Sequence, residues 1–391
     1  MPSVRLIVPR GGALAFVFCL LALAAAAMQP AAAAPDTVPR YRVEVLRQST
    51  VSSTTTIAAL NNRGEVAFNV YSVEGGVSSN TPYLWSQGRA TDWGERFQEI
   101  TDLSDRGDVL GYRTGSFENT WVWHDYRMTA LPGRLREISP DGQWFAGEAH
   151  DEFVQTRAAL SDGIRLWFSE PIPGEIQSYA VDVNNHGVAV GGSIPDRHGG
   201  DSALIFDRDR TTRLGPLLTP RVESFAKAIN GSGQVVGNDD SPFLYDNGVL
   251  TRLDQEAFDI NDRGWIVGRD RLLLDGVSHT VMELLRPVDR ARVSGLFLSF
   301  INDAGQLAGN AAYDGQGAAV LLTPVPEPPA WALGLAGLGV LALARRRARW
   351  DNGDTWRTCL PPALSAAVAA AHAGAVQGQG PSASGIDAPP L

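Results

Sequence analysis

The sequence has 391 residues, of which 44% are hydrophobic and 19% are charged, and its formal net charge is −10 at pH 7. Its mean hydropathy of −0.09 excludes a polytopic membrane protein, and its apolar fraction excludes a chain that is disordered throughout. The 41 Gly and 24 Pro favour short strands and tight turns over long helices. Because an acidic surface repels phosphate backbones, we expect no nucleic-acid partner.

Residues 1–34 have the pattern of a secretory signal peptide. Arg5 and Arg10 precede an apolar run over residues 13–27, and the alanines of residues 31–33 fit the small-residue rule for cleavage. The apolar run is shorter than the ~20 residues that a membrane-spanning helix needs. We therefore predict removal by signal peptidase, with a retained membrane anchor as the alternative.

One short pattern recurs seven times: an aliphatic residue, Asn or Ser, two further residues, Gly, and then an apolar strand. The copy LNNRGEVAF begins at Leu60, and the copy INDAGQLAG begins at Ile301. The Asn or Ser side chain can accept the backbone N–H two residues on, and Gly adopts the positive φ that a tight hairpin needs. The turn glycines, 31 to 46 residues apart, are Gly64, Gly107, Gly142, Gly187, Gly233, Gly264 and Gly305.

Each copy is followed by a second, looser hairpin, such as Phe243–Tyr245 before the turn Asp246–Gly248. A unit is thus four short strands in about 40 residues, which is the size of a β-propeller blade. A single four-stranded sheet is marginally stable until neighbours cover both of its faces, and a closed ring covers every face. We therefore predict an all-β fold, a β-propeller of seven four-stranded blades over residues 35–324.

The last unit lacks a fourth strand, because residues 318–322 run directly into a proline-rich segment. A free strand, Tyr41–Leu46, precedes the first unit. We predict that this strand completes the last blade and closes the ring.

The repeated hairpin resembles the bacterial extracellular HAF-type repeat, over roughly residues 41–324. The shared pattern is aliphatic–Asn–Asp–x–Gly–Gln–apolar–apolar–Gly, followed by an Ala–Phe–Leu–aromatic strand. The first three units depart from it, with Ser replacing Asn and the closing Gly lost or displaced. The resemblance implies an exported propeller and no defined activity, so no catalytic residue is carried over. It is strongest in units four to seven, whose turn asparagines are Asn184, Asn230, Asn261 and Asn302.

The segment 325–349 is similar to the PEP-CTERM sorting signal of Gram-negative bacteria. It consists of a short motif, an apolar stretch over residues 331–344 that is expected to form a transmembrane sorting helix, and an arginine cluster. The resemblance implies that an exosortase recognises the Pro-Glu-Pro site, while the arginines hold the cytoplasmic side. The alternative is a proline-rich linker followed by a core helix. The motif and cluster residues are Val325, Pro326, Glu327, Pro328, Arg345, Arg346 and Arg347.

The tail 350–391 departs from such signals, which normally end within a few residues of the arginines. It is rich in Ala, Gly, Pro and Ser, so we expect it to be disordered.

The repeats hold no recognisable catalytic, metal or cofactor motif. Cys19 and Cys359 lie outside them, and no two histidines have metal-ligand spacing. The turns 182–187 and 259–264 partly resemble a calcium loop, but His and Arg at the fifth position favour a plain hairpin turn. We therefore predict no catalytic residue, no metal and no cofactor.

Extra loop length on a rigid scaffold is where binding residues usually lie. The least repetitive segments are 69–82, 112–119 and 193–202. Within the last of these, His198 and Asp201 are the candidate ligand-contacting residues.

These features favour a non-enzymatic propeller at the outer cell envelope or in the extracellular matrix. Its expected partners are signal peptidase and an exosortase for processing, and exopolysaccharide or surface proteins for function, with a transient inner-membrane anchor. The alternative is a carbohydrate-active hydrolase or lyase, which a pair of carboxylates at the channel mouth would favour. A third hypothesis is a membrane-anchored protein that keeps its C-terminal span.

Overall fold

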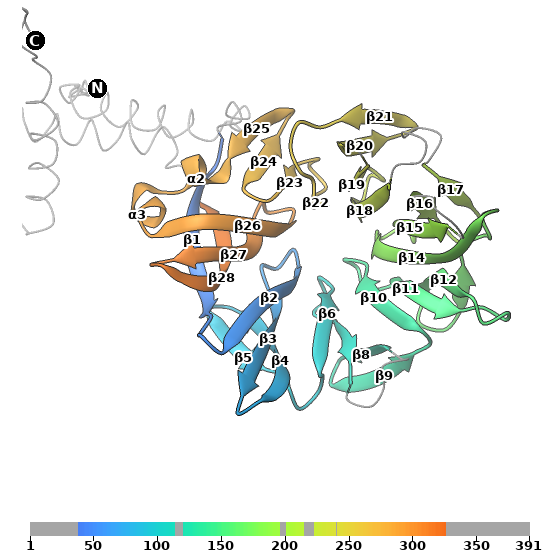
Figure 1. The fold of residues 1–391 in the computed structure, drawn as a ribbon, viewed down its shortest axis with the longest axis horizontal. Coiled ribbons are helices and arrows are strands. Elements are labelled where there is room, and N and C mark those ends of the chain that lie inside the picture. The colour runs from blue at the N-terminus through green and yellow to red at the C-terminus, as the bar shows by residue number, and fades with distance from the viewer. Residues whose placement is uncertain (1–37, 114–119, 196–200, 215–222, 240, 326–391) are drawn as a thin grey trace, which may run out of the picture. The chain divides into compact units, whose positions relative to one another are not determined.

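The repeats fold into seven four-stranded antiparallel sheets arranged as blades around a ring (Figure 1). The computed structural model describes residues 38–113, 120–195, 201–214, 223–239 and 241–325. In each blade the first strand lies toward the centre of the ring, and the later strands follow outward. The predicted seven-bladed β-propeller is confirmed.

The first four blades consist of consecutive strands. Blade 1 contains β2 (Ser53–Leu60), β3 (Val66–Glu74), β4 (Val77–Ser86) and β5 (Arg89–Asp92); blade 2 contains β6 (Glu99–Leu103), β7 (Val109–Tyr112), β8 (Thr120–His124) and β9 (Arg127–Leu131). Blade 3 contains β10 (Arg134–Ile138), β11 (Phe145–His150), β12 (Thr156–Ser161) and β13 (Leu166–Phe168); blade 4 contains β14 (Glu175–Val183), β15 (Ala189–Pro195), β16 (Ser202–Phe206) and β17 (Thr211–Arg213).

The last three blades include the strand that closes the ring. Blade 5 contains β18 (Phe225–Ile229), β19 (Val235–Asn238), β20 (Pro242–Asp246) and β21 (Val249–Arg252); blade 6 contains β22 (Asp259–Ile260), β23 (Ile266–Val267), β24 (Arg271–Leu274) and β25 (Val277–Thr280). Two short helices follow, α2 (Val281–Leu284) and α3 (Pro287–Arg290). Blade 7 contains β26 (Val293–Ile301), β27 (Leu307–Tyr313), β28 (Gln316–Val325) and β1 (Arg40–Gln48).

Blade 7 is built from both ends of the propeller sequence. Its strand order is β1-β28-β27-β26, and β1 runs antiparallel to β28. Val43 lies opposite Leu322, and Val45 lies opposite Val320. The predicted closure of the ring by an N-terminal strand is therefore confirmed.

The connection between blades 6 and 7 also holds β1. The Arg286 backbone N–H donates to the Tyr41 carbonyl at 3.0 Å, and the Asp289 carboxylate accepts the Val43 N–H at 3.4 Å. Tyr41 is fully buried, and its hydroxyl donates to the Gly305 carbonyl at 3.0 Å. The closing strand is thus fixed by side-chain contacts as well as by its ladder with β28.

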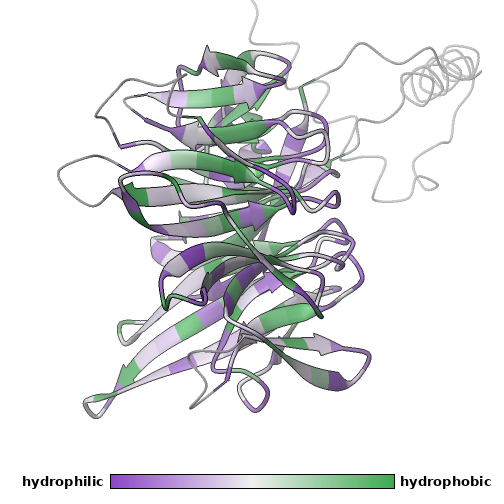
Figure 2. Ribbon diagram, turned by 90° about the vertical axis from the view of Figure 1, so that its right-hand side faces the viewer, coloured by the Kyte–Doolittle hydropathy of each residue, from purple (hydrophilic) through white to green (hydrophobic). Residues whose placement is uncertain are grey.

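Apolar side chains are buried between the blades rather than in one central core. The described residues form seven hydrophobic clusters, and each cluster lies between two neighbouring blades. In one of them, Phe68 and Val70 of blade 1 pack with Ala308 and Leu321 of blade 7. Hydrophobic residues lie along the strands, and many of the turns are hydrophilic (Figure 2). Each sheet therefore depends on both of its neighbours for a core.

The first strand carries a β-bulge at an equivalent position in six of the blades. In blade 4 the bulge lies between Ala180 and Asp182, where Ala180 pairs with Gly191. A Cβ on Gly191 would lie 2.0 Å from the Tyr179 carbonyl oxygen. The bulge pushes the first strand against the second, which is why the glycine that closes the second strand recurs in the repeats.

In the part of the chain that the structure describes, no helix is long and apolar enough to cross a membrane. The predicted signal peptide 1–34, the sorting segment after Val325 and the tail 350–391 lie outside the described residues.

Because β1 closes the ring, we expect Tyr41→Ala to lower the stability of the whole propeller. Removing this buried ring and its hydrogen bond should lower the free energy of unfolding by about 3–5 kcal/mol. Tyr41→Phe keeps the ring and should cost only about 1 kcal/mol. Urea unfolding followed by tryptophan fluorescence measures both changes. Equal and small losses would contradict the closing role of β1.

Candidate functional site

The turns between the first and second strands form one rim of the central channel. In blade 1, Asn61 Oδ1 accepts the Arg63 N–H at 3.1 Å and the Glu65 N–H at 2.9 Å, and Gly64 has a φ of 74°. The seven predicted turn glycines all have positive φ, between 68° and 92°. We name the residues at the Asn61 position the turn residues: Asn61, Ser104, Ser139, Asn184, Asn230, Asn261 and Asn302.

The turn asparagines also link each blade to the next one. Asn Nδ2 donates to the backbone carbonyl of the following turn residue, which satisfies two buried polar groups at once. The series begins in blade 4 and ends in blade 2, so it spans five consecutive blade contacts. The bonds are Asn184 to Asn230 at 3.1 Å, Asn230 to Asn261 at 3.0 Å, Asn261 to Asn302 at 2.9 Å, Asn302 to Asn61 at 2.9 Å and Asn61 to Ser104 at 3.0 Å.

Blades 2 and 3 have serine as the turn residue and use other contacts. Without an amide at this position, the Asp105 N–H donates to the Pro140 carbonyl at 2.7 Å. The Asp141 N–H donates to Asn185 Oδ1 at 2.8 Å. The rim is therefore continuous, although the series of amide bonds is interrupted.

Four acidic residues lie on the first strands, each five residues before a turn glycine. Asp182 Oδ1 accepts the Val183 N–H at 2.7 Å, and Oδ2 accepts the Ile229 N–H of blade 5 at 2.7 Å. Asp102 and Asp259 bridge to the following blade in the same way. The Glu137 carboxylate has no hydrogen-bond partner among the described residues. We name these the channel carboxylates: Asp102, Glu137, Asp182 and Asp259.

The channel carboxylates hold their protons more tightly than exposed carboxyl groups. Burial raises the pKa of Asp102 to about 8, that of Asp259 to about 7 and that of Asp182 to about 6, although the backbone N–H bonds act in the opposite direction. Burial, followed by the charge of Asp102, raises the pKa of Glu137 well above its ordinary value. Protonation lowers the mutual repulsion of the acids near neutral pH.

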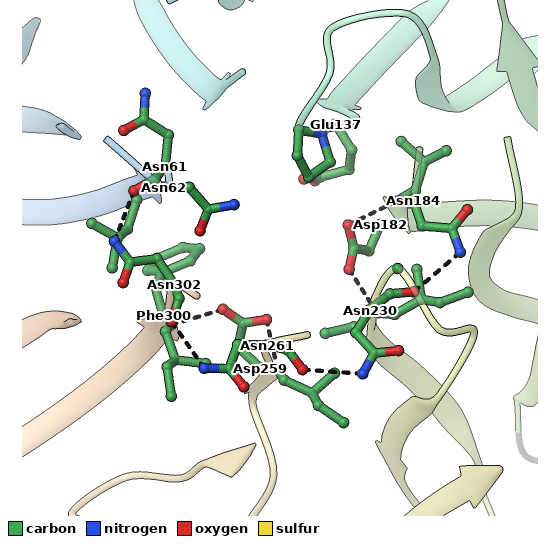
Figure 3. A pocket seen from close by; sticks show the side chains of 18 of the residues that line it. Asn61, Asn62, Glu137, Asp182, Asn184, Asn230, Asp259, Asn261, Phe300 and Asn302 are labelled. Atoms are coloured by element: carbon green, nitrogen blue, oxygen red, sulfur yellow. Dashed lines mark hydrogen bonds between the residues drawn. The ribbon is translucent and has the colours of Figure 1, made fainter. Parts of the chain in front are cut away.

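The rim and the channel carboxylates enclose a cavity of about 330 Å³ (Figure 3). Its walls come from the first strands and turns of all seven blades. Lys227 is the one cation among the lining residues, while Phe258 and Phe300 contribute aromatic rings. A polar, acidic cavity of this kind suits a ligand with hydroxyl groups or positive charge and repels anions. The further acids at the rim are Asp105, Asp262 and Asp303.

No group of three or more His, Cys, Asp or Glu side chains that could hold a metal ion occurs among the described residues. The turns that partly resemble a calcium loop are hairpin turns, in which Asp182 and Asp259 accept backbone N–H groups instead.

Of the two loop residues predicted to contact a ligand, the structure describes Asp201, which does not line the cavity. His198 lies outside the described residues. Asp201 accepts the Tyr179 hydroxyl at 3.3 Å, and its carbonyl accepts the Ser224 N–H at 2.7 Å, so it joins blades 4 and 5. Of the sorting motif, the structure describes Val325, which ends β28 opposite Arg40.

Sequence reasoning missed the channel carboxylates and Lys227 as a group. A signal for the carboxylates is present, since an acid stands five residues before the turn glycine in four of the seven copies.

No protein-family model matches the chain, and no curated protein does either. Several solved structures have a similar backbone fold. One is an acylaminoacyl peptidase from Pyrococcus horikoshii, with 11% identity and a TM-score of 0.44. The match covers 68% of this chain and 52% of that one. A putative TolB from Agrobacterium tumefaciens has 14% identity and a TM-score of 0.37, covering 74% and 100%. TolB from Acinetobacter baumannii has 10% identity and a TM-score of 0.30, covering 71% and 64%.

The chain spans about half the length of the peptidase and 64% of the Acinetobacter TolB. At these identities and scores, the similarities carry no argument about activity.

The amide series predicts that Asn302→Asp destabilises the ring. The variant keeps the Oδ1 acceptor but loses the donor to the Asn61 carbonyl, so we expect a loss of about 1–3 kcal/mol in the free energy of unfolding. Asn247→Asp is the control, because Asn247 lies in an exposed turn and its amide donates only to the adjacent Asp246. Equal effects in urea unfolding would contradict the linking role.

The raised pKa values predict that stability falls as the pH rises. The folded state binds these protons more tightly than the unfolded chain, in which the carboxyl pKa is 3.8. The stabilisation is therefore complete below the unfolded pKa of 3.8, falls as the pH rises above it, and is fully lost once the pH has passed the folded pKa values of about 6 to 8. Asp259→Asn should reduce the slope by at most about 1.4 kcal/mol per pH unit between about pH 5 and 7. Urea unfolding over that range tests this, and an unchanged slope would contradict it.

Proposed function

We propose that this protein is a non-enzymatic β-propeller of the outer cell envelope or extracellular matrix, which binds exopolysaccharide or surface proteins. The observation that carries the proposal is that most of the channel carboxylates are occupied by hydrogen bonds within the ring. Asp102, Asp182 and Asp259 each accept backbone N–H groups from two neighbouring blades, so they link the blades of the ring. An acid used in this way is poorly placed to exchange protons with a substrate.

The cavity supports a binding role for this propeller. The rim carries amide and carboxyl groups, which are the kinds of polar group that hydrogen-bond to a hydroxyl-rich ligand. Its acidic character favours an uncharged or cationic partner over an anionic one.

Export and processing form the second part of the proposal. Signal peptidase would remove residues 1–34, and an exosortase would act at the Pro326-Glu327-Pro328 site, ending a transient inner-membrane anchorage. The arginine cluster and the apolar stretch before it fit this order of events.

The two proposed cleavages predict where the N-terminus and the C-terminus of the exported protein lie. Intact-mass spectrometry should find an N-terminus near residue 35 and no sequence beyond the sorting motif. Glu327→Ala should retain the C-terminal segment, whereas Glu170→Ala, an exposed glutamate in the connection between blades 3 and 4, should be processed normally. An exported protein that is intact beyond Arg347 would contradict sorting and favour a retained membrane span.

The alternative is a carbohydrate-active hydrolase or lyase, and one observation favours it. The channel holds clustered acids, and among them Glu137 combines a raised pKa with a carboxylate that the described residues leave without a hydrogen bond. Such a group has the character of a general acid.

An uncharged glucan distinguishes the two functions, because only the enzyme would cleave it. The binding role predicts retention of the protein in affinity electrophoresis and no release of reducing ends. Release of reducing ends by the wild type, lost in Glu137→Gln with unchanged thermal stability, would establish the alternative and overturn the binding role.

A further inference from the structure

Blades 5, 6 and 7 carry aromatic residues on the part of their first strands that lies away from the rim. Phe225 begins β18, Phe258 directly precedes β22, and Phe297 lies on β26 opposite Asn310. The rings of Phe258 and Phe297 stack with their centres 5.5 Å apart, and Phe297 is 44% exposed. Phe225 and Phe297 do not line the rim cavity, so these rings form part of a different surface.

Two cations lie against these rings. Lys227 Nζ is 4.1 Å from the centre of the Phe258 ring and 5.6 Å from that of the Phe225 ring. The guanidinium carbon of Arg269 is 4.9 Å from the centre of the Phe297 ring. The face of an aromatic ring attracts a cation, so these contacts favour the charged form of both side chains. We name the five residues the aromatic–cation cluster: Phe225, Lys227, Phe258, Arg269 and Phe297.

The Lys227 ammonium has no counter-charge of its own. With the Asn238 amide oriented so that both of its ends are bonded, the amide oxygen accepts the ammonium at 3.0 Å. An ammonium has three N–H donors, and among the described residues no carboxylate pairs with this one. The nearby Glu256 is instead bound by Arg269, at 2.9 and 3.2 Å. A ligand oxyanion would therefore meet a half-buried positive charge that the described residues leave without an ion pair.

The rim cavity and the aromatic–cation cluster differ in charge. The cavity lining holds seven carboxyl groups, whereas the cluster contributes two cations beside one acid, Glu256. An anionic ligand is therefore repelled at the rim and attracted to the cluster. Arg269 binds Glu256 through Nε and Nη2, and no described residue accepts a hydrogen bond from its Nη1.

We propose that the aromatic–cation cluster binds a carboxylated saccharide, with a uronate carboxylate paired to the Lys227 ammonium and the sugar C–H groups against the phenyl rings. Arg269 Nη1 is available to a second oxygen of the ligand. The proposal rests on the proposed binding of exopolysaccharide. It adds a second site, which takes the anionic class of saccharide that the rim cavity repels.

The site can be observed directly, because Lys227 is the single lysine of the sequence. An N-hydroxysuccinimide ester of acetic acid acylates the folded full-length protein at Lys227 and at the N-terminal amine, and peptide mass spectrometry gives both rates. The probes are trigalacturonate, uncharged maltotriose and N-acetylated tri-L-glutamate, which carries carboxylates without sugar rings. Arg89→Lys adds a control lysine at an exposed position of β5.

We expect trigalacturonate to slow the acylation of Lys227 several-fold and to leave the N-terminal amine and the control lysine unaffected. Maltotriose should give no protection, and 0.5 M NaCl should weaken the effect of trigalacturonate. An unprotected Lys227 would overturn the proposal, and equal protection by the glutamate peptide would overturn the assignment to a saccharide.

Variants test the same site by affinity electrophoresis in polygalacturonate. Lys227→Met removes the charge but keeps a long apolar side chain, so it should lose the retardation, whereas Lys227→Arg should keep part of it and Arg89→Met all of it. Thermal unfolding checks that each variant is folded. Retardation of the wild type by an uncharged glucan but not by polygalacturonate would overturn this inference alone. Retardation by neither polymer would overturn the binding role as well.

Discussion

The structure depends on the burial of apolar side chains between sheets that have no core of their own. Each of the seven hydrophobic clusters draws residues from two blades, so removing one blade would expose two clusters. Buried apolar area contributes roughly 25 cal/mol for each Å². That gain is available to a blade only when both of its neighbours are present, which makes ring closure a condition of stability for every blade.

Closure of the ring also determines which polar groups are needed at the inner end of each blade. A ring of sheets brings backbone groups from neighbouring turns together in places that water does not freely reach, and those groups need partners. The turn asparagines and the channel carboxylates supply them. The arrangement concentrates acids on the axis, and the resulting cavity with its single amine follows from how the ring is held together.

Much of this could be read from the sequence. The spacing of the turn glycines and the unpaired strand at residues 41–46 predicted the blades and their closure, because both follow from local turn chemistry and from counting strands. The channel carboxylates and Lys227 could not be predicted in the same way. The acid five residues before the turn glycine recurs in the sequence, but its role appears only when first strands that are 31 to 46 residues apart come to face one axis. The glycines that close the second strands recur visibly, but their cause, a carbonyl oxygen of the bulged first strand, belongs to the paired sheet.

The pairing of β1 with β28 has a consequence for the order of assembly. Among the described strands, β1 is made first, and it finds its partner only when β28, the last of them, has been made. Until then blade 7 is incomplete, and the clusters on both of its sides stay open to water. The ring therefore cannot close before the chain has been made as far as Val325, and any fold that forms earlier is an open arc of blades.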